Sequence, residues 1–306
     1  MTILLTGATG FIGKAIYETN ENGFRCVVRN ASQYTLNDVF KVDGIHSTTN
    51  WNAAFQGGVD SVIHLAGLAH NASYTDEEFF DVNTEGTIHL ASEAAKAGVK
   101  RFVFVSSIGV NGANTFGNAF DENETPKPHN SYAESKLRAE QGLQKIAKET
   151  GLEVVIIRPT LVYGANAPGN VGSLTKLIKK VPFLPFGLCK NKRSFVSVTN
   201  LASFIYTCVI HPKAAGETFL ISDGESISTK AFTSAIAKGL GTSLVQLPVP
   251  ITLMKLAAKV LGKSHQANQL IGDLEVDPSK ASRLLGWTPP ETMAQAMDKL
   301  NKQRLL

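Results

Sequence analysis

The sequence predicts an α/β protein in which a doubly wound parallel sheet is joined to a smaller, interleaved C-terminal lobe. Short apolar runs alternate with helix-length segments through the first two-thirds of the chain, a pattern typical of parallel strands buried on both faces. A glycine-rich turn follows the first of these runs. After Arg158 the amino-acid composition changes, because residues 164–172 are rich in Gly, Pro and Asn. These observations predict one large sheet domain and a second lobe built from later segments.

The apolar runs and the helical periodicity give the individual elements. Strands of the first lobe are expected at Thr2–Thr6, Phe24–Arg29, Ser61–Leu65, Arg101–Ser106 and Glu153–Ile157. Helical patterns lie near 11–21, 76–97 and 131–149, and later near 228–240, 250–262 and 291–303. For the helix at 131–149, Ser131 and Glu134 predict a capping box, and Gly151 follows its end.

Two later strands, at 194–198 and 218–222, are expected to return to the first lobe. The predicted dinucleotide-binding domain is therefore residues 1–165 plus about 194–222. The predicted substrate lobe is about 166–193 plus 223–306. The stretch "PITLMKLAAKVLG" at 250–262 is expected to be a packed amphipathic helix.

Bulk composition excludes several classes of protein. The chain has 306 residues, 43% hydrophobic and 18% charged residues, and a formal net charge of +4, which gives no reason to expect a nucleic acid partner or membrane insertion. Cys26, Cys189 and Cys208 lack the spacing of a metal site or a disulfide framework, which fits a reducing cytoplasm. The start, "MTILLTG", lacks the basic region of a signal peptide. We expect a cytoplasmic protein without a metal.

The opening "ILLTGATGFIGKAI" contains the strongest local motif. A strand runs into Gly7-x-x-Gly10-x-x-Gly13 and then into a helix. Glycines allow the tight turn and let the backbone approach a pyrophosphate at the start of the helix. This strand-turn-helix context predicts a Rossmann-type dinucleotide site that includes Thr9, Phe11 and Ile12.

The end of the second expected strand bears on the choice of cofactor. An NAD site commonly has Asp or Glu about 20 residues past the glycines, but Arg29 and Asn30 stand there. Arginine suits a 2′-phosphate through charge-assisted contacts. The sequence thus favours NADP(H) over NAD(H), although a solvated arginine beside an NAD site is the alternative.

Tyr132 and Lys136 lie four residues apart and therefore on one face of the expected helix. Together with the glycine motif, further segments make the chain resemble an extended short-chain dehydrogenase/reductase of the NAD(P)-dependent nucleotide-sugar epimerase/dehydratase family, of the UDP-glucose 4-epimerase-like type. The matching segments are "VIHLAG" at 62–67, "NTEGT" at 83–87, the serine pair 106–107, "RPTLVYG" at 158–164, "RSFVSVTNLA" at 193–202 and "LGWTPP" at 285–290.

The resemblance implies the catalytic group. Tyr132 would be the general acid and base, Ser107 would hold the reacting oxygen, and Lys136 would bind the nicotinamide ribose and lower the pKa of the tyrosine. A free tyrosine has a pKa of about 10, too high for work near neutral pH. A nearby ammonium and a cationic nicotinamide would favour the phenolate, and a shift of about 3 units would correspond to about 4 kcal/mol. An exposed helical pair is the alternative reading.

Other residues match the family more loosely. The resemblance implies cofactor contacts by Leu65, Ala66, Gly67, Asn83, Val105, Ser106 and Pro159. It implies substrate contacts by Asn170 and Arg193, which would hold a sugar-nucleotide diphosphate together with Ser107, and a uracil pocket near 184–187. The alternatives are a buried asparagine that satisfies backbone groups at 83 and a surface salt bridge at 193.

Two departures narrow the reaction. Family dehydratases carry Asp-Glu directly after the catalytic hydroxyl, whereas Ile108-Gly109 stand here, so a dehydratase is not expected. Many UDP-galactose 4-epimerases have a lysine near position 69, where this chain has Ala69 followed by His70.

We therefore expect oxidoreduction at C4 of a UDP-hexose. Arg29 tilts the expectation toward NADPH-dependent reduction of a UDP-4-keto-6-deoxy-N-acetylhexosamine, as in enzymes of O-antigen clusters that make UDP-N-acetylquinovosamine. The alternative is a UDP-glucose or UDP-N-acetylglucosamine 4-epimerase with bound NAD. Alternatives of another kind are a non-catalytic NADP(H) sensor and a dehydrogenase of another secondary alcohol such as a sterol. The resemblance also implies a homodimer that pairs helices 76–97 and 131–149.

Overall fold

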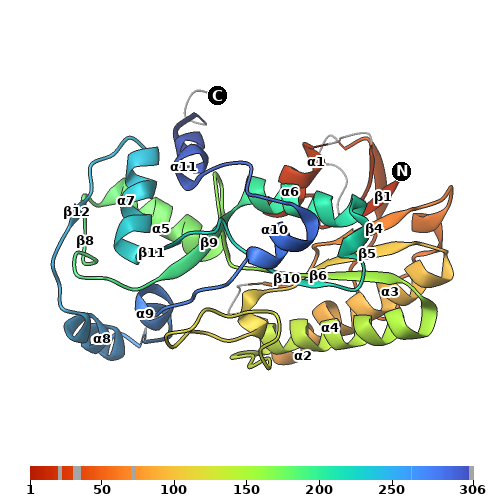
Figure 1. The fold of residues 1–306 in the computed structure, drawn as a ribbon, viewed down its shortest axis with the longest axis horizontal. Helices are drawn as coiled ribbons and strands as arrows, with labels where there is room; N and C mark the ends of the chain where they lie inside the picture. Colours follow the sequence, from red (N-terminus) through yellow and green to blue (C-terminus); the bar gives the residue numbers. More distant parts are fainter. Residues whose placement is uncertain (20–22, 30–35, 70–73, 263, 303–306) are drawn as a thin grey trace.

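A parallel sheet covered by helices on both faces forms the larger part of the molecule (Figure 1). The computed structural model describes residues 1–19, 23–29, 36–69, 74–262 and 264–302. Within these residues the large sheet has seven strands in the order β10-β6-β5-β4-β1-β2-β3, and all neighbouring pairs are parallel. This is the doubly wound α/β class that the sequence predicts.

The strands of the large sheet are β1 (Ile3–Thr6), β2 (Phe24–Val28), β3 (Asp38–Lys41), β4 (Ser61–His64), β5 (Arg101–Val105), β6 (Glu153–Pro159) and β10 (Thr218–Ile221). Its helices are α1 (Phe11–Tyr17), α2 (Asp76–Phe79), α3 (Gly86–Lys96), α4 (Ser131–Thr150), α6 (Val198–Ile210) and α10 (Ser279–Leu285). Helices α1, α6 and α10 cover one face and α2, α3 and α4 the other (Figure 1). Strands β1, β4 and β5 are buried along their whole length and are therefore mostly apolar, with their polar residues at the strand ends.

The second lobe gathers the remaining elements around a core of its own. Its strands are β7 (Leu161–Tyr163), β8 (Phe183–Leu184), β9 (Arg193–Ser197), β11 (Ser226–Ile227) and β12 (Val245–Gln246). Its helices are α5 (Gly169–Lys180), α7 (Thr229–Gly239), α8 (Ile251–Val260), α9 (Ser264–Ile271) and α11 (Met293–Lys302). The sheet orders are β11-β9-β7 and β12-β8.

One of the two expected returning strands joins the large sheet. Strand β10 pairs with β6 at its edge, as predicted for 218–222. The expectation for 194–198 was wrong, because β9 pairs with β7 and β11 in the small sheet. The helix that follows it, α6, is the part that returns to pack on the large sheet. The exact lobe boundaries stay a prediction.

Helix α4 is capped one residue earlier than expected. The N-cap is Asn130, whose side-chain oxygen accepts a hydrogen bond from the Ala133 backbone N–H at 2.8 Å. The predicted capping box on Ser131 is therefore wrong, because Ser131 is already the first helical residue. At the other end Gly151 adopts φ 79°, the left-handed conformation that suits glycine.

Helix α8 also differs from its expectation. It contacts the lobe core through Ile251 and Met254, but it contains no buried residue. Its other apolar side chains point outward, so the prediction of a packed helix holds for one edge only. Among the described helices, none is both long enough and apolar enough to cross a bilayer.

The cap of α4 gives a test of the local structure. We expect Asn130→Ala to lower the free energy of unfolding by about 1 kcal/mol, because the Ala133 N–H loses its acceptor. Ser131→Ala is the matched control and should change it by no more than a few tenths of a kcal/mol. Urea unfolding followed by circular dichroism measures both. A loss of unfolding free energy confined to the Ser131 variant would instead support a capping box on Ser131.

Candidate active site

The glycine turn between β1 and α1 has no room for larger side chains. Gly7 has φ +72°, and a Cβ built on it would lie 2.9 Å from the Ala66 backbone nitrogen. A Cβ on Gly13 would lie 2.1 Å from the Gly7 carbonyl oxygen. No side chain caps α1 at Gly10. The turn is thus a bare backbone cradle at the carboxyl edge of the sheet, and it fits the pyrophosphate of a dinucleotide.

Three predicted cofactor residues flank this cradle. Thr9, Phe11 and Ile12 are partly buried. Phe11 packs against the core of the second lobe, and Ile12 packs against the core of the first. The turn therefore lies where the two lobes meet.

The chain after β4 approaches the same cradle. The backbone nitrogens of Leu65 and Ala66 both donate to the Thr6 hydroxyl at 3.2 Å. A Cβ on Gly67 would lie 2.8 Å from the side-chain oxygen of Asn83 and 3.6 Å from Lys136 Nζ. The strand end is thus held against β1 and kept open next to the buried lysine.

Asn83 holds this segment in place from a π-helical stretch, Phe80–Glu85, between α2 and α3. Its side-chain oxygen accepts from the Leu68 N–H at 2.7 Å, and its amide donates to the Leu68 carbonyl at 3.0 Å and to Ser135 Oγ at 3.1 Å. A side chain that is 0% exposed is thereby fully occupied by protein groups. Of the two readings left open by the sequence, Asn83 satisfies backbone groups beside the cradle.

Ser107, Tyr132 and Lys136 come together at the ends of β5 and α4. The Ser107 hydroxyl forms a hydrogen bond with the Tyr132 phenol and accepts one from the Gly109 N–H at 3.1 Å. Lys136 Nζ donates to the Val105 carbonyl at 3.0 Å and lies 4.5 Å from the ring centroid of Phe104. The lysine is only 4% exposed, so Tyr132 and Lys136 are not the exposed helical pair considered as the alternative.

The pKa values correct one expectation. Burial raises the pKa of Tyr132 to about 12, while the hydrogen bond from Ser107 works in the opposite direction. Burial lowers the pKa of Lys136 to about 8, and the charge of Glu140 partly offsets this. In the protein without cofactor, the cost of desolvating the phenolate therefore exceeds the stabilisation by its neighbours. The expected lowering of the tyrosine pKa by Lys136 together with a cationic nicotinamide stays a prediction.

A buried ion pair beneath the lysine was missed by the sequence analysis. Glu140, 2% exposed, receives two hydrogen bonds from the Arg158 guanidinium, at 3.0 and 2.5 Å, and one from Ser106 Oγ at 2.5 Å. Arg158 also donates to the Asn111 side chain at 2.9 Å. The signal was present, because Tyr132, Lys136 and Glu140 repeat every four residues along α4.

This ion pair also changes the interpretation of Ser106. Its hydroxyl donates to Glu140 and its backbone N–H donates to the Ile157 carbonyl, so any hydrogen bond that Ser106 makes to a cofactor has to use one of its oxygens as the acceptor. Val105 ends β5 and uses its carbonyl to hold Lys136. Pro159 is buried at the end of β6.

The residues expected to choose the cofactor are only partly described. Arg29 is exposed directly after β2, at the edge of the sheet where the cradle lies. Asn30 and His70 lie outside the described residues. Ala69 is exposed, and Ile108 and Gly109 are buried in a short 3-10 helix, with no carboxylate at those positions. Within the described part of the chain, no three His, Cys, Asp or Glu side chains are placed to hold a metal ion.

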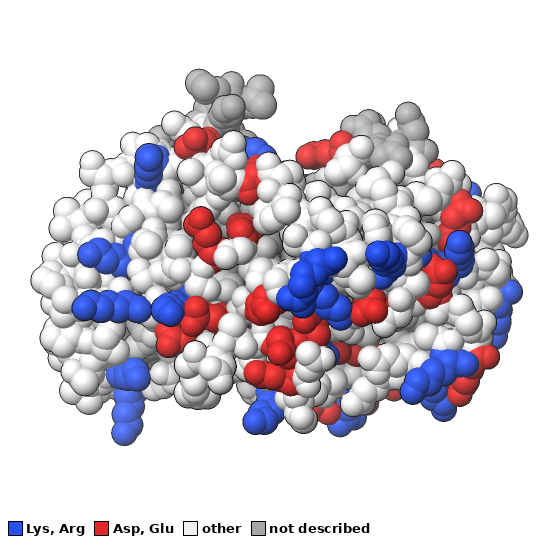
Figure 2. Space-filling view, viewed as in Figure 1, with Lys and Arg blue, Asp and Glu red and all other residues white. Residues whose placement is uncertain are grey.

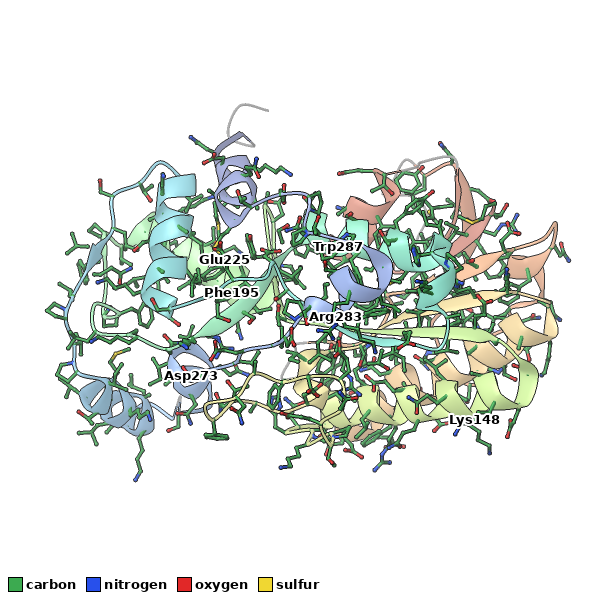
Figure 3. The ribbon with its side chains drawn as sticks, viewed as in Figure 1. Lys148, Phe195, Glu225, Asp273, Arg283 and Trp287 are labelled. Atoms are coloured by element: carbon green, nitrogen blue, oxygen red, sulfur yellow. The ribbon has the colours of Figure 1, made fainter. Side chains whose placement is uncertain are left out.

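Apart from the glycine cradle, a pocket lies in the C-terminal lobe. The first residue of the chain that lines it is Leu161, two positions after Pro159. Its lining includes Leu161, Asn170, Val171, Leu174, Arg193, Phe195, Thr229, Phe232, Gln269 and Leu270. Phe195 of β9 (Figure 3) stacks on Phe232 at 3.9 Å and forms an apolar wall. Leu184 and Phe186, from the segment 184–187 expected near the uracil, are buried in the same lobe core but do not line this pocket, and a uracil site at 184–187 stays a prediction.

Arg193 gives this pocket its charge. It is 8% exposed, and it donates to the Gly272 carbonyl at 2.9 Å. Burial lowers its pKa to about 10, and Asp273 (Figure 3) works against that. Among the described residues no carboxylate lies within salt-bridge distance of it, so the surface salt bridge considered from sequence is wrong. A buried guanidinium without a paired anion favours an anionic ligand. Asn170, at the same pocket, is exposed and donates to Gln269 at 3.2 Å.

Comparison with known proteins identifies the class. Residues 3–222 match the NAD dependent epimerase/dehydratase family, and the chain belongs to this family of enzymes. It is 40% identical to a UDP-glucose 4-epimerase of Vibrio cholerae over 96% of this chain and 92% of the relative.

Two further relatives are more distant. The chain is 26% identical to an N-acetyl-alpha-D-glucosaminyl-diphospho-ditrans,octacis-undecaprenol 4-epimerase of Escherichia coli O157:H7, over 97% and 93% of the two chains. The crystal structure of UDP-N-acetylglucosamine 4-epimerase from Bacillus cereus has the same fold, with a TM-score of 0.81 at 22% identity and full coverage of both chains.

The buried lysine should cost stability at neutral pH. Its folded pKa of about 8 lies below its ordinary value of 10.5. The protonated form is therefore penalised on folding below pH 8, and the penalty fades as the pH rises to 10.5. The 2.5-unit difference corresponds to about 3 kcal/mol, offset by about 1 kcal/mol for the Val105 hydrogen bond. We expect Lys136→Met to be more stable than the parent protein near neutral pH.

Urea unfolding near neutral pH and again at high pH measures this effect. The advantage of Lys136→Met should disappear at the higher pH. Lys148→Met, on an exposed part of the same helix (Figure 3), is the control and should show no such dependence. An unchanged difference between the two pH values would contradict the depressed pKa.

Breaking the Glu140–Arg158 pair should be severe. Glu140→Gln leaves Arg158 buried without its counter-ion, so we expect a loss of about 3 kcal/mol or more in unfolding free energy. Glu134→Gln, which breaks the exposed pair with Arg138 on the same helix, should cost less than about 1 kcal/mol. Equal losses in chemical denaturation would show that the buried pair has no special weight.

Proposed function

We propose that this protein is an NAD-dependent 4-epimerase of a UDP-hexose. The observation that carries the choice of reaction is the near full-length similarity to a UDP-glucose 4-epimerase at 40% identity. The site is compatible with it, because a tyrosine, a serine and a lysine meet beside a dinucleotide cradle. The preference for net reduction that Arg29 suggested finds no support in these comparisons.

In the proposed mechanism the residues of the chain position and move a proton. Ser107 would hold the C4 oxygen of the sugar, and Tyr132 would take the proton from that oxygen and later return it. A bound nicotinamide would supply the reversible removal and return of hydride at C4. Lys136 would keep a positive charge next to Tyr132. With a second positive charge in the site, the phenolate would become accessible despite the burial that raises its pKa to about 12.

We propose NAD rather than NADP(H) as the cofactor. An epimerase starts and ends with the oxidised form, so the cofactor can stay bound through the cycle. Solved structures of similar fold are described with NAD bound. The cradle of Gly7, Gly10 and Gly13 would hold its pyrophosphate, and Arg29, exposed at the end of β2, would lie near its ribose without requiring a 2′-phosphate.

The substrate diphosphate would bind at Arg193 and Asn170. The buried guanidinium supports a phosphorylated substrate over a sterol. A sugar carried on a polyprenyl diphosphate is the second candidate, because the E. coli relative is named for such a substrate and the same arginine would serve either diphosphate. A homodimer that pairs the helical segment 76–97 with α4 remains part of the proposal, and light scattering of the purified protein tests it.

The reaction is tested with UDP-glucose and UDP-N-acetylglucosamine, without added nucleotide or reductant. We expect the galacto product, and NAD⁺ released when the protein is denatured. Tyr132→Phe should lower kcat by about 10²- to 10⁴-fold with the fold retained. A requirement for NADPH and a 4-keto sugar would identify a reductase instead. Unchanged turnover in Tyr132→Phe would remove that residue from the mechanism, and no turnover by the parent with any hexose would favour the sensor.

A further inference from the structure

The modest net charge of the chain hides a strong asymmetry between its parts. Residues 166–193 contain five lysines and one arginine, and residues 226–272 contain five lysines, whereas neither segment contains Asp or Glu. These two segments thus hold eleven of the thirty basic residues and none of the twenty-six acidic ones. Most of the C-terminal lobe is made from them, so this lobe is strongly basic while the rest of the chain is acidic. Charge asymmetry of this kind favours an anionic partner.

The same lobe presents an apolar helix to solvent. On α8 the side chains of Leu253, Leu256, Val260 and the following Leu261 are 54, 58, 80 and 69% exposed. The spacing of three and four residues places Leu253, Leu256 and Val260 on one side of the helix, and Leu261 follows them as the C-cap residue. The opposite side, with Ile251 and Met254, contacts the lobe core. We call these four outward side chains, with Lys255 and Lys259, the α8 face.

The lysines of the α8 face border the apolar stripe. Lys255 and Lys259 are exposed and lie between the outward and the inward sides of the helix. Neither α8 nor α9 contains an acidic residue. In Figure 2 the outer end of this lobe shows blue side chains, and the red ones lie nearer the middle of the molecule. A helix with an apolar stripe bordered by lysines is the arrangement that lies in the interface of an anionic bilayer.

We propose that the α8 face docks the protein on the surface of an anionic phospholipid bilayer, without spanning it. Lipid phosphates complement the basic lobe, and the leucine and valine side chains can enter the acyl boundary. A second copy of the chain is a poorer occupant, because two α8 faces would bring like charges together.

Docking would also bring the substrate pocket close to the bilayer. Helix α9 packs against α8, and its Gln269 and Leu270 line the pocket that contains Arg193. The enzyme would then take up its diphosphate substrate next to the headgroups. This inference does not depend on the reaction proposed above, since binding to a membrane needs no turnover.

The test is co-sedimentation of the full-length protein with vesicles of phosphatidylcholine, with and without phosphatidylglycerol. We expect binding to the anionic vesicles that weakens as salt is raised. Leu256→Ser combined with Val260→Ser should weaken it at least about tenfold. Lys255→Gln and Lys259→Gln should each weaken it about fivefold. Circular dichroism and epimerase activity on a soluble UDP-sugar check that these variants are folded.

Matched controls lie outside the C-terminal lobe. Ile210→Ser replaces a side chain that is 55% exposed, and Lys145→Gln with Lys148→Gln removes two exposed lysines of α4. These variants should bind as the parent does. Absence of binding, equal binding to neutral vesicles, or equal losses in the controls would overturn the proposal. So would a change of oligomer mass in the α8 variants without a change in vesicle binding, because the occupant would then be a second copy.

Discussion

The register of helix α4 against strands β5 and β6 is the constraint on which the site depends. Tyr132, Lys136 and Glu140 follow one another at four-residue spacing along one side of the helix. The buried Glu140–Arg158 pair fixes that side against β6, and the Lys136–Val105 hydrogen bond fixes it against β5. A rotation of α4 would break both contacts and leave three buried charges, Lys136, Glu140 and Arg158, without these partners, which is costly. The phenol is thereby held at Ser107, at the carboxyl end of the sheet.

This arrangement carries an electrostatic cost of its own. Both members of the Tyr132–Lys136 pair are buried enough to oppose ionisation, with pKa values near 12 and 8. Without its cofactor, at neutral pH, the protein is therefore poorly prepared to take a proton from a sugar hydroxyl. Activation would require the positive charge that a bound oxidised nicotinamide brings. Such coupling would keep the tyrosine inactive until the cofactor is bound. The burial of ionisable side chains that produces it lowers the stability of the fold, as is common at functional sites.

The two lobes differ in how their charged side chains are arranged. The sheet domain has ion pairs that are buried or partly buried, Glu140–Arg158 and Arg101–Glu153. The C-terminal lobe instead keeps Arg193 buried beside a pocket without a carboxylate partner among the described residues, and it exposes lysines on its outer helices. The first lobe is suited to position reacting groups and the second to attract anions.

The sequence by itself predicted the α/β fold class, the positions of the parallel strands and the glycine cradle. It also singled out Ser107, Tyr132 and Lys136 as one group. Most of those features depend on local rules: buried strands are mostly apolar, a backbone at φ +72° favours glycine, and helical residues four apart share a face. Ser107 was singled out by the family resemblance. Tertiary structure alone decided that β9 joins the small sheet, that Asn130 rather than Ser131 caps α4, and that 184–187 lies in the lobe core. It also decided that burial raises the tyrosine pKa, that Glu140 pairs with Arg158, and that α8 turns its leucines outward. Each of these depends on which distant segment packs against a residue, and neither composition nor periodicity contains that information.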